Sequence, residues 1–244
     1  ALHERMIAKL LVLLIVLCAS CGSALNFLAV GDWGGIEIRP YYTPGQMASV
    51  AGMDKVAKSL DAKFMLAVGD NYYHSGVTDE SDPRFGSTFE KVYSPDSLQF
   101  PWYAIAGNHD HVGNVSAQIA YSSHSSRWNF EDFYYSKSFT SDDGATIDIV
   151  LIDTVELSGL NRLEEHEPGY FDPLPLQARS VAETQWSWIE EKIRGSTADY
   201  LLVVGHYPVY SVCEHGNTAT LIENLRPLLI QAGGQYLWGH DHCM

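Results

Sequence analysis

The sequence predicts an α/β fold, and two recurring patterns predict it. Short apolar runs, of a length that suits a buried strand, stop at a glycine that precedes a polar or ionisable residue. Stretches with apolar residues at helical spacing lie between several of these runs. Strand, helix and strand in that order favour a right-handed βαβ connection, so we expect a polar site where parallel strands end.

The first such unit spans the segment from Phe27 to Val68. Phe27 to Val30 is a short apolar run, and Phe64 to Val68 is a second one that ends at Gly69. Gln46 to Leu60 carries apolar residues at helical spacing, which predicts an amphipathic helix between the two strands.

The remaining elements follow from the same signals. Ser180 and Glu183 have the spacing of a capping box, so we expect a helix over Val181 to Arg194 that ends at Gly195. A short helical piece is expected at 87–93, and a helix broken at Pro227 is expected over 218–232. The other expected strands are 102–106, 146–152, 201–204 and 235–238, with edge strands within 128–139.

Composition limits the class of protein. The 244 residues are 46% hydrophobic and 18% charged, which is typical of a globular domain with one sizeable core. A formal net charge of −15 argues against nucleic acid or an anionic membrane as a partner. A phosphate-type ligand would therefore need a local positive charge, such as a metal ion.

Residues 1–24 are expected to be removed before folding. Lys9 precedes the apolar run Leu10 to Leu17, and small residues follow to Ala24, which is the pattern of a secretory signal peptide. Residues 1–5 precede Met6 and read as upstream sequence. We therefore expect a domain over 25–244 that enters the secretory pathway, to be secreted or lysosomal, without a membrane anchor after cleavage.

The secretory context bears on two other features. Cys18 and Cys21 leave with the signal peptide, so Cys213 and Cys243 remain, and the sequence leaves open whether they form a disulfide. Asn114-Val115-Ser116 is a glycosylation sequon, and we expect Asn114 to carry a glycan.

Ligand-type residues follow five of the expected strands. They are Asp32, Asp70, Asn108, His206 and the pair His240 and His242. Each has an ordinary alternative, because aspartate caps helices, asparagine forms turns and a single histidine is more often a hydrogen-bonded residue. Their recurrence beside glycine favours a metal site, and the carboxylate, amide and imidazole donors without thiolate suit iron, zinc or manganese.

These residues resemble the motifs of the purple acid phosphatases. The five blocks are Asp32-Trp33-Gly34, Gly69-Asp70-Asn71-Tyr72-Tyr73, Gly107-Asn108-His109-Asp110, Val203-Val204-Gly205-His206 and Gly239-His240-Asp241-His242. The stretch from Gly31 to about Phe139 resembles the small, tartrate-resistant type found in animals. General metallophosphoesterases carry histidine where this chain has Gly34, and they lack the tyrosine that matches Tyr73.

The resemblance implies a binuclear centre and assigns its ligands. A ferric ion would be held by Asp32, Tyr73 and His242. A divalent ion, Fe²⁺ or Zn²⁺, would be held by Asn108, His206 and His240. Asp70 would bridge the two. Phenolate and carboxylate are hard anions that favour Fe³⁺, whereas imidazole and amide suit a divalent ion, so the chemistry agrees with this assignment.

The resemblance also implies a reaction. His109 and His215 match the histidines that bind phosphoryl oxygens and protonate the leaving group, and His111 is a weaker candidate for a supporting role. A metal-bound hydroxide would attack a phosphate monoester in line, with an acidic optimum if a histidine must be protonated. Small phosphate esters or phosphoproteins are the implied substrates. His3, His74, His124 and His166 are left as ordinary residues.

For the fold, the resemblance implies a four-layer sandwich of two mixed β-sheets flanked by helices. The family continues past its last His-x-His pair, so C-terminal strands are expected to be missing from this chain. The acidic segment from Leu157 to Arg179 matches an exposed, protease-sensitive loop that restrains activity until it is cut. Oligomeric state does not follow from the sequence.

Two other functions stay open beside the acid phosphatase. One is a secreted iron-binding or iron-carrying glycoprotein with incidental hydrolysis; His109 and His215 argue against it, because carriage needs neither. The other is a phosphodiesterase or protein phosphatase of the wider superfamily, against which Tyr73 argues.

Overall fold

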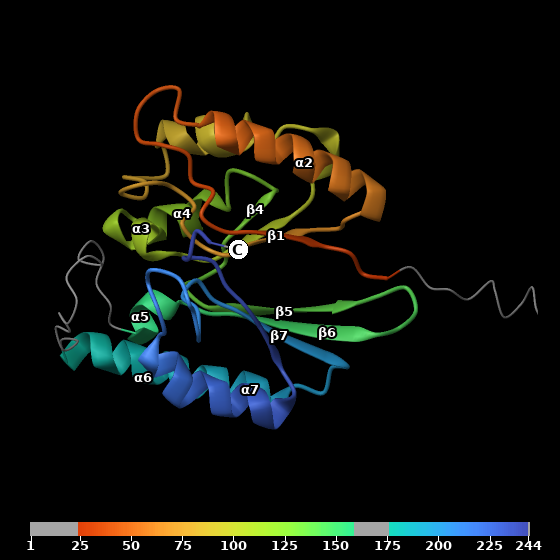
Figure 1. The fold of residues 1–244 in the computed structure, drawn as a ribbon, viewed down its shortest axis with the longest axis vertical. Coiled ribbons are helices and arrows are strands. Elements are labelled where there is room, and N and C mark those ends of the chain that lie inside the picture. The colour runs from red at the N-terminus through yellow and green to blue at the C-terminus, as the bar shows by residue number, and fades with distance from the viewer. Residues whose placement is uncertain (1–23, 159–175, 244) are drawn as a thin grey trace, which may run out of the picture.

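In the computed structural model, which describes residues 24–158 and 176–243, two four-stranded sheets pack face to face between helices (Figure 1). Helix α2 covers the outer side of the first sheet, and helices α6 and α7 cover the outer side of the second (Figure 1). This order of helix, sheet, sheet and helix is the expected four-layer α/β architecture.

The first sheet is parallel and has the order β1-β2-β3-β4. Its strands are β1 (Leu28–Val30), β2 (Met65–Ala67), β3 (Trp102–Ala104) and β4 (Trp128–Asn129). Leu28 is opposite Met65, and Met65 is opposite Trp102. With this register, the first three strands end level with one another, so the loops that follow them meet at one edge of the sheet.

The second sheet is mixed and has the order β5-β6-β7-β8. Its strands are β5 (Tyr135–Thr140), β6 (Thr146–Leu151), β7 (Tyr200–Val204) and β8 (Gln235–Leu237). Strands β5 and β6 are antiparallel, whereas the β6–β7 and β7–β8 pairs are parallel. Leu151 is opposite Val204, and Val204 is opposite Leu237, so these three strands also end at a common edge.

Local sequence features mark the ends of the helices that cover the two sheets. Helix α2 (Pro44–Leu60) has the Thr43 side chain as N-cap on the Gln46 amide, and proline occupies its first turn. Helix α6 spans Leu176–Gly195, and α7 (Arg226–Ala232) ends at Gly233 in the left-handed conformation. The shorter helices are α3 (Asn108–Val112), α4 (Val115–Tyr121), α5 (Thr154–Ser158), η1 (Phe85–Glu90), η2 (Asp96–Leu98) and η3 (Leu221–Leu225).

Aromatic side chains fill the space around the first sheet and between the sheets. The Phe64 ring stacks on that of Phe139 from strand β5, with centroids 4.5 Å apart, so this pair joins the two sheets. The buried Trp33 ring lies 5.5 Å from Trp102 and 5.3 Å from Tyr93 between centroids. Because Trp33 directly follows Asp32, this packing fixes the loop that carries the first candidate ligand.

Two expectations need comment. The predicted helix start at Ser180 is wrong: α6 begins at Leu176, and the Ser180 carbonyl accepts a hydrogen bond from the Thr184 hydroxyl at 2.8 Å inside the helix. The predicted signal peptide at 1–24 and most of the acidic segment 157–179 lie outside the described residues. Within the described ranges, no helix has both the length and the apolar character needed to cross a membrane.

Candidate metal centre

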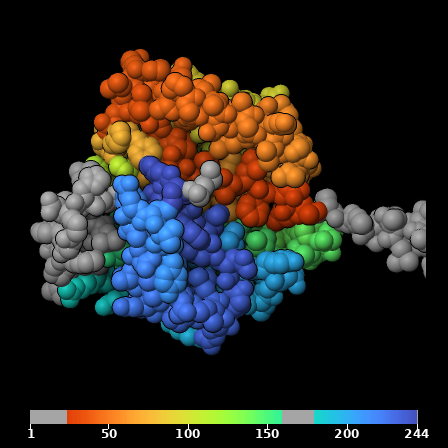
Figure 2. Space-filling view, in the orientation of Figure 1, coloured from red at the N-terminus to blue at the C-terminus, as the bar shows by residue number. Residues whose placement is uncertain are grey.

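The candidate ligands come from both sheets and meet where the strands end. Asp32, Asp70 and Asn108 follow strands β1, β2 and β3, while His206 and His240 follow β7 and β8. Two segments far apart in the sequence are brought together here, because the His240 amide donates to both carboxylate oxygens of Asp32 at 3.0 Å. Figure 2 shows the same meeting at the surface, where dark blue C-terminal residues lie beside red N-terminal ones.

Three of these residues adopt a backbone conformation that is uncommon outside glycine. Asp32, Asp70 and His240 have φ values of 57°, 52° and 73°. Such a conformation costs on the order of 1–3 kcal/mol at a non-glycine residue, and it persists where surrounding structure enforces it. Strained backbone of this kind is concentrated at functional sites, and here all three residues belong to the candidate centre.

Two glycines allow the loops to approach closely. A Cβ atom at Gly69, where φ is +94°, would lie 2.5 Å from the His206 Nδ1 atom. A Cβ atom at Gly107 would overlap the Asp70 carboxylate and lie 2.5 Å from the Asp70 backbone nitrogen. Asp70 and His206 can therefore pack against these turns only because Gly69 and Gly107 have no side chain.

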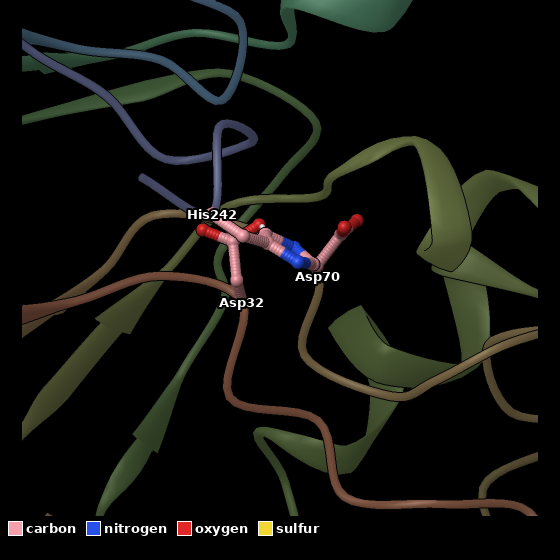
Figure 3. A group of neighbouring side chains, drawn as sticks. All are labelled: Asp32, Asp70 and His242. Atoms are coloured by element: carbon pink, nitrogen blue, oxygen red, sulfur yellow. Dashed lines mark ion pairs between the residues drawn. The ribbon is translucent and has the colours of Figure 1, made fainter. Parts of the chain in front are cut away.

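The first group of donor atoms contains Asp32, Tyr73 and His242. The Tyr73 hydroxyl lies 3.3 Å from Asp32 Oδ1 and 3.0 Å from His242 Nε2. His242 Nε2 is in turn 3.4 Å from Asp32 Oδ1. One ligand atom each from Asp32, Asp70 and His242 lies within 4.8 Å of the others. Figure 3 shows the His242 ring between the two aspartates, which enter from separate loops.

The second group contains Asn108, His206 and Asp70. The His206 Nδ1 atom lies 2.8 Å from the Val68 carbonyl oxygen; since a carbonyl only accepts, this nitrogen carries the proton. The other ring nitrogen, Nε2, lies 3.0 Å from Asn108 Oδ1 and 3.4 Å from Asp70 Oδ1. Either a proton on Nε2 or a metal ion can occupy the position between these three atoms.

Electrostatics favour a positive charge at this position. Burial lowers the pKa of His206, but the carboxylates of Asp70 and Asp32 outweigh it and raise the pKa overall. Burial, followed by the charges of Asp70 and Asp32, raises the pKa of the Tyr73 hydroxyl above its usual value. The carboxylates of Asp32 and Asp70 thus favour a positive charge at this position, which a metal ion would supply.

His240 is suited to metal binding for a different reason. Burial, with the neighbouring histidines, lowers the pKa of its imidazole to about 2, so the ring stays neutral as a ligand must. Its ring centroid is 5.1 Å from that of His206 and 4.1 Å from that of His215. The candidate catalytic residue His215 therefore lies beside the second group of ligands.

His109 and His111 have different hydrogen-bond partners and therefore different positions relative to the candidate centre. The His109 amide donates to Asp70 Oδ1 at 3.1 Å, and its Nδ1 lies 2.7 Å from the His74 carbonyl oxygen, so the Nε2 atom is left to face the site. His111 instead directs Nε2 at the buried Asp153 carboxylate, 2.6 Å away. His109 is thus placed beside the bridging candidate, whereas His111 belongs to a contact between the two sheets.

Asp110 organises the site and was not singled out from the sequence. Its carboxylate accepts hydrogen bonds from the amides of Asn71, Tyr72 and Gly107 at 3.0, 3.2 and 2.8 Å. Burial and the charge of Asp70 raise its pKa to about 6 in spite of these bonds. Asp110 therefore ties the loop after β2 to the loop after β3; the sequence signal was its place in the Gly107-Asn108-His109-Asp110 block.

Cys213 and Cys243 form a disulfide, with Cα atoms 6.5 Å apart. The sequence left this pairing open. The bond links the segment before His215 to the residue after His242.

Comparisons with known proteins agree with this geometry. The calcineurin-like phosphoesterase family profile matches residues 25–244. Tartrate-resistant acid phosphatase type 5 of Rattus norvegicus is 44% identical over 238 residues, covering 96% of this chain and 71% of that protein. The Homo sapiens protein of the same name is 46% identical over 224 residues, covering 90% of this chain and 67% of its own length. Purple acid phosphatase 3 of Arabidopsis thaliana is 32% identical, covering 90% and 58%.

Two solved structures share the fold. GAP50, titled the anchor in the inner membrane complex of Plasmodium, superposes with a TM-score of 0.73 at 25% identity, covering 89% of this chain and 66% of that one. A dimetal phosphatase of Danio rerio gives a TM-score of 0.59 at 17% identity over 90% of this chain and 82% of its own, a likeness of fold alone.

The chain belongs to the calcineurin-like phosphoesterases and, within them, to the purple acid phosphatases of the tartrate-resistant type. By this membership it is a phosphoric monoester hydrolase of the acid phosphatase class. The family implies a binuclear metal centre, although the chain spans only about two thirds of the length of its tartrate-resistant relatives.

Proposed function

We propose that this protein hydrolyses phosphate monoesters at a binuclear Fe³⁺–M²⁺ centre, where M is iron or zinc. The observation that carries the proposal is the position of Asp70. One of its oxygens faces His206 at 3.4 Å, and its carboxylate also belongs to the cluster with Asp32 and His242. A carboxylate shared by two groups of donors is the arrangement that a bridging ligand requires.

The residues present fit the two ions. Asp32, Tyr73 and His242 would hold Fe³⁺, because a phenolate and a carboxylate are hard anionic donors. Asn108, His206 and His240 would hold the divalent ion, and Asp70 would bridge. When bound, the ions would supply an activated water at low pH and offset the charge of the phosphoryl oxygens.

The chain's own residues would orient the ester and supply a proton. His109 is tied by its amide to Asp70 and by Nδ1 to the His74 carbonyl, so its Nε2 is directed at the space where a phosphoryl oxygen would bind. His215 lies against His240 and would protonate the departing alkoxide. Turnover should then be fastest at acid pH, because donation to the leaving group requires a protonated acid.

Replacing Asp70 tests the proposal directly. We expect purified wild-type chain to contain two metal ions and to hydrolyse an aryl phosphate at acid pH, and Asp70→Asn to lose both metal and turnover. Elemental analysis and a phosphate-release assay measure the two quantities on the same sample. Wild-type protein that is folded and contains one metal ion or none, without turnover, would refute the proposal.

A second candidate function is an iron-binding glycoprotein in which hydrolysis is incidental. It is kept beside the first because a fold alone does not fix a function: GAP50, which shares this fold, is described as an anchor. His215→Ala separates the two: an enzyme loses turnover of an alkyl phosphate, whose leaving group needs a proton, while it keeps its metal and its tyrosinate colour, whereas a carrier is unaffected.

The cellular setting is also part of the proposal. We place the protein in the secretory pathway, secreted or lysosomal, with a glycan on the exposed Asn114 and small phosphate esters or phosphoproteins as substrates. Cleavage within 157–179 should raise turnover; limited proteolysis that leaves the rate unchanged would rule out a restraining role for this segment.

A further inference from the structure

The disulfide joins two segments that each carry a residue of the candidate centre. Cys213 lies two positions before His215, and Cys243 directly follows His242. We infer that the Cys213–Cys243 bond is a positioning device that holds His215 at the leaving-group side of the site and His242 at the metal side. The inference rests on the roles proposed above for these two histidines.

The segment from Ser211 to Asn217 is a compact turn. The Ser211 amide donates to the Asn217 side chain at 2.9 Å, and the Cys213 amide donates to the Ser211 hydroxyl at 2.9 Å. The Gly216 amide donates to the Cys213 carbonyl at 3.2 Å. Because these bonds fold the turn on itself, a covalent link at Cys213 places His215 along with it, 4.1 Å from the His240 ring between centroids.

The segment from Gly239 to Cys243 is fixed by backbone hydrogen bonds at its start, whereas the His242 side chain near its end is exposed. The Gly239 amide donates to the His206 carbonyl at 3.0 Å, and the His240 amide donates to Asp32. The His242 side chain, in contrast, is 62% exposed, although its Nε2 lies 3.0 Å from the Tyr73 hydroxyl. Ordering a residue costs backbone conformational entropy, and a covalent bond at the next residue reduces that cost before metal binds.

A leaving-group series tests the His215 side of the inference. In Cys213→Ala/Cys243→Ala, we expect kcat for an alkyl phosphate to fall about 10–100-fold, the loss that a displacement near 1 Å produces. An aryl phosphate, whose leaving group needs no proton, should be affected much less. In a His215→Ala background, removal of the disulfide should cause no further loss for the alkyl ester, because the two changes remove the same effect.

Metal release tests the His242 side without any assay of turnover. We expect the double alanine variant to lose metal to a chelator faster than wild type, as measured by elemental analysis over time. Val212→Ala is the matched control, since Val212 is fully exposed in the same turn and is no part of the candidate centre. If the double variant is insufficiently stable, a water-soluble phosphine followed by alkylation gives the same comparison on wild-type protein. The disulfide oxidises the phosphine, water supplies the oxygen of the phosphine oxide and the two protons, and the S–S bond becomes two thiols.

The outcomes distinguish this inference from the proposed function. An inactive but metal-loaded wild-type protein would refute the phosphatase assignment. An active wild type whose disulfide variant keeps the same alkyl-to-aryl ratio and the same metal-release rate would refute the inference alone. Equal losses for both esters with unchanged metal release would also refute it, because that pattern is expected from a bond that only stabilises the fold.

Discussion

Tyr72 and Tyr73 are neighbours in the chain with different surroundings. The Tyr72 hydroxyl is buried among aromatic rings and has no hydrogen-bond partner among the described residues. The Tyr73 hydroxyl faces Asp32 and His242. Since burial and two carboxylates raise the Tyr73 pKa, its phenolate forms only when a cation replaces the proton. In the proposed centre, Tyr73 is therefore the residue whose ionisation would report on a bound metal.

Tyr73→Phe should abolish the visible absorption that a ferric phenolate gives, and it should weaken iron retention. Tyr72→Phe is the matched control: it removes a buried hydroxyl without a partner, so colour should persist and stability should stay equal or rise. Visible absorption spectra of the two iron-loaded variants and the wild type measure this difference. Colour that survives in Tyr73→Phe would remove Tyr73 from the ligand set.

The elements show which local signals the sequence carries. The strands β1, β2, β3, β7 and β8 were predictable because each is a short apolar run that ends near a glycine. Helices α3 and α4 were not, since each is too short for a hydrophobic period to be visible. The start of α6 was misplaced because Ser180 and Glu183 have capping-box spacing, and the residues before them also continue the helix.

Asn114 has a structural role besides its place in the sequon. Its side-chain oxygen accepts from the Ala117 amide at 3.0 Å and caps helix α4, and its nitrogen donates to the Thr78 carbonyl at 3.2 Å. Ser116, the third sequon residue, is exposed and takes no part in this cap. Asn114→Ala and Ser116→Ala both abolish the sequon, but they should therefore affect the stability of the protein differently.

Asn114→Ala should lower the free energy of unfolding by about 1 kcal/mol more than Ser116→Ala, because only the first removes an N-cap. Both variants should lose the same mass if Asn114 is glycosylated. Denaturant unfolding and intact mass of the secreted proteins provide the measurements. Equal stability of the two variants would show that the cap contributes nothing, and an unchanged mass would show that Asn114 carries no glycan.

Across the whole molecule, the candidate centre is where the two sheets meet. The sequence could propose its members because each lies at a strand end, and the shared edges of the two sheets bring those ends together. It could not show which nitrogen of His206 faces Asn108, that Asp110 ties two loops, or that Cys213 reaches Cys243. Each of these depends on contacts between segments far apart in the chain.

The sheets are also joined by an ion pair between the half-buried His111 of α3 and the buried Asp153, which follows β6. Burial lowers the pKa of His111, but the Asp153 carboxylate outweighs it and raises the pKa overall. The pKa of the nearby Glu156 is raised to about 7 by burial and by Asp153. Both groups favour the protonated form in the folded state. Their stabilising contribution is thus complete at low pH and is lost as pH rises through the folded-state pKa values.

His111→Gln should therefore cost more stability in acid than in base. We expect a difference from wild type of about 1.5–3 kcal/mol near pH 5.5, the range of a hydrogen bond to a charged group, and a smaller difference near pH 8.5. His124→Gln is the control, because the His124–Glu80 pair is 53% and 56% exposed and should contribute little at either pH. Denaturant unfolding of metal-loaded proteins at the two pH values measures the differences, and comparison with wild type cancels the titration of the metal ligands. A His111→Gln effect that is equal at both pH values would mean that the ring stays neutral and joins the sheets by packing and an uncharged hydrogen bond.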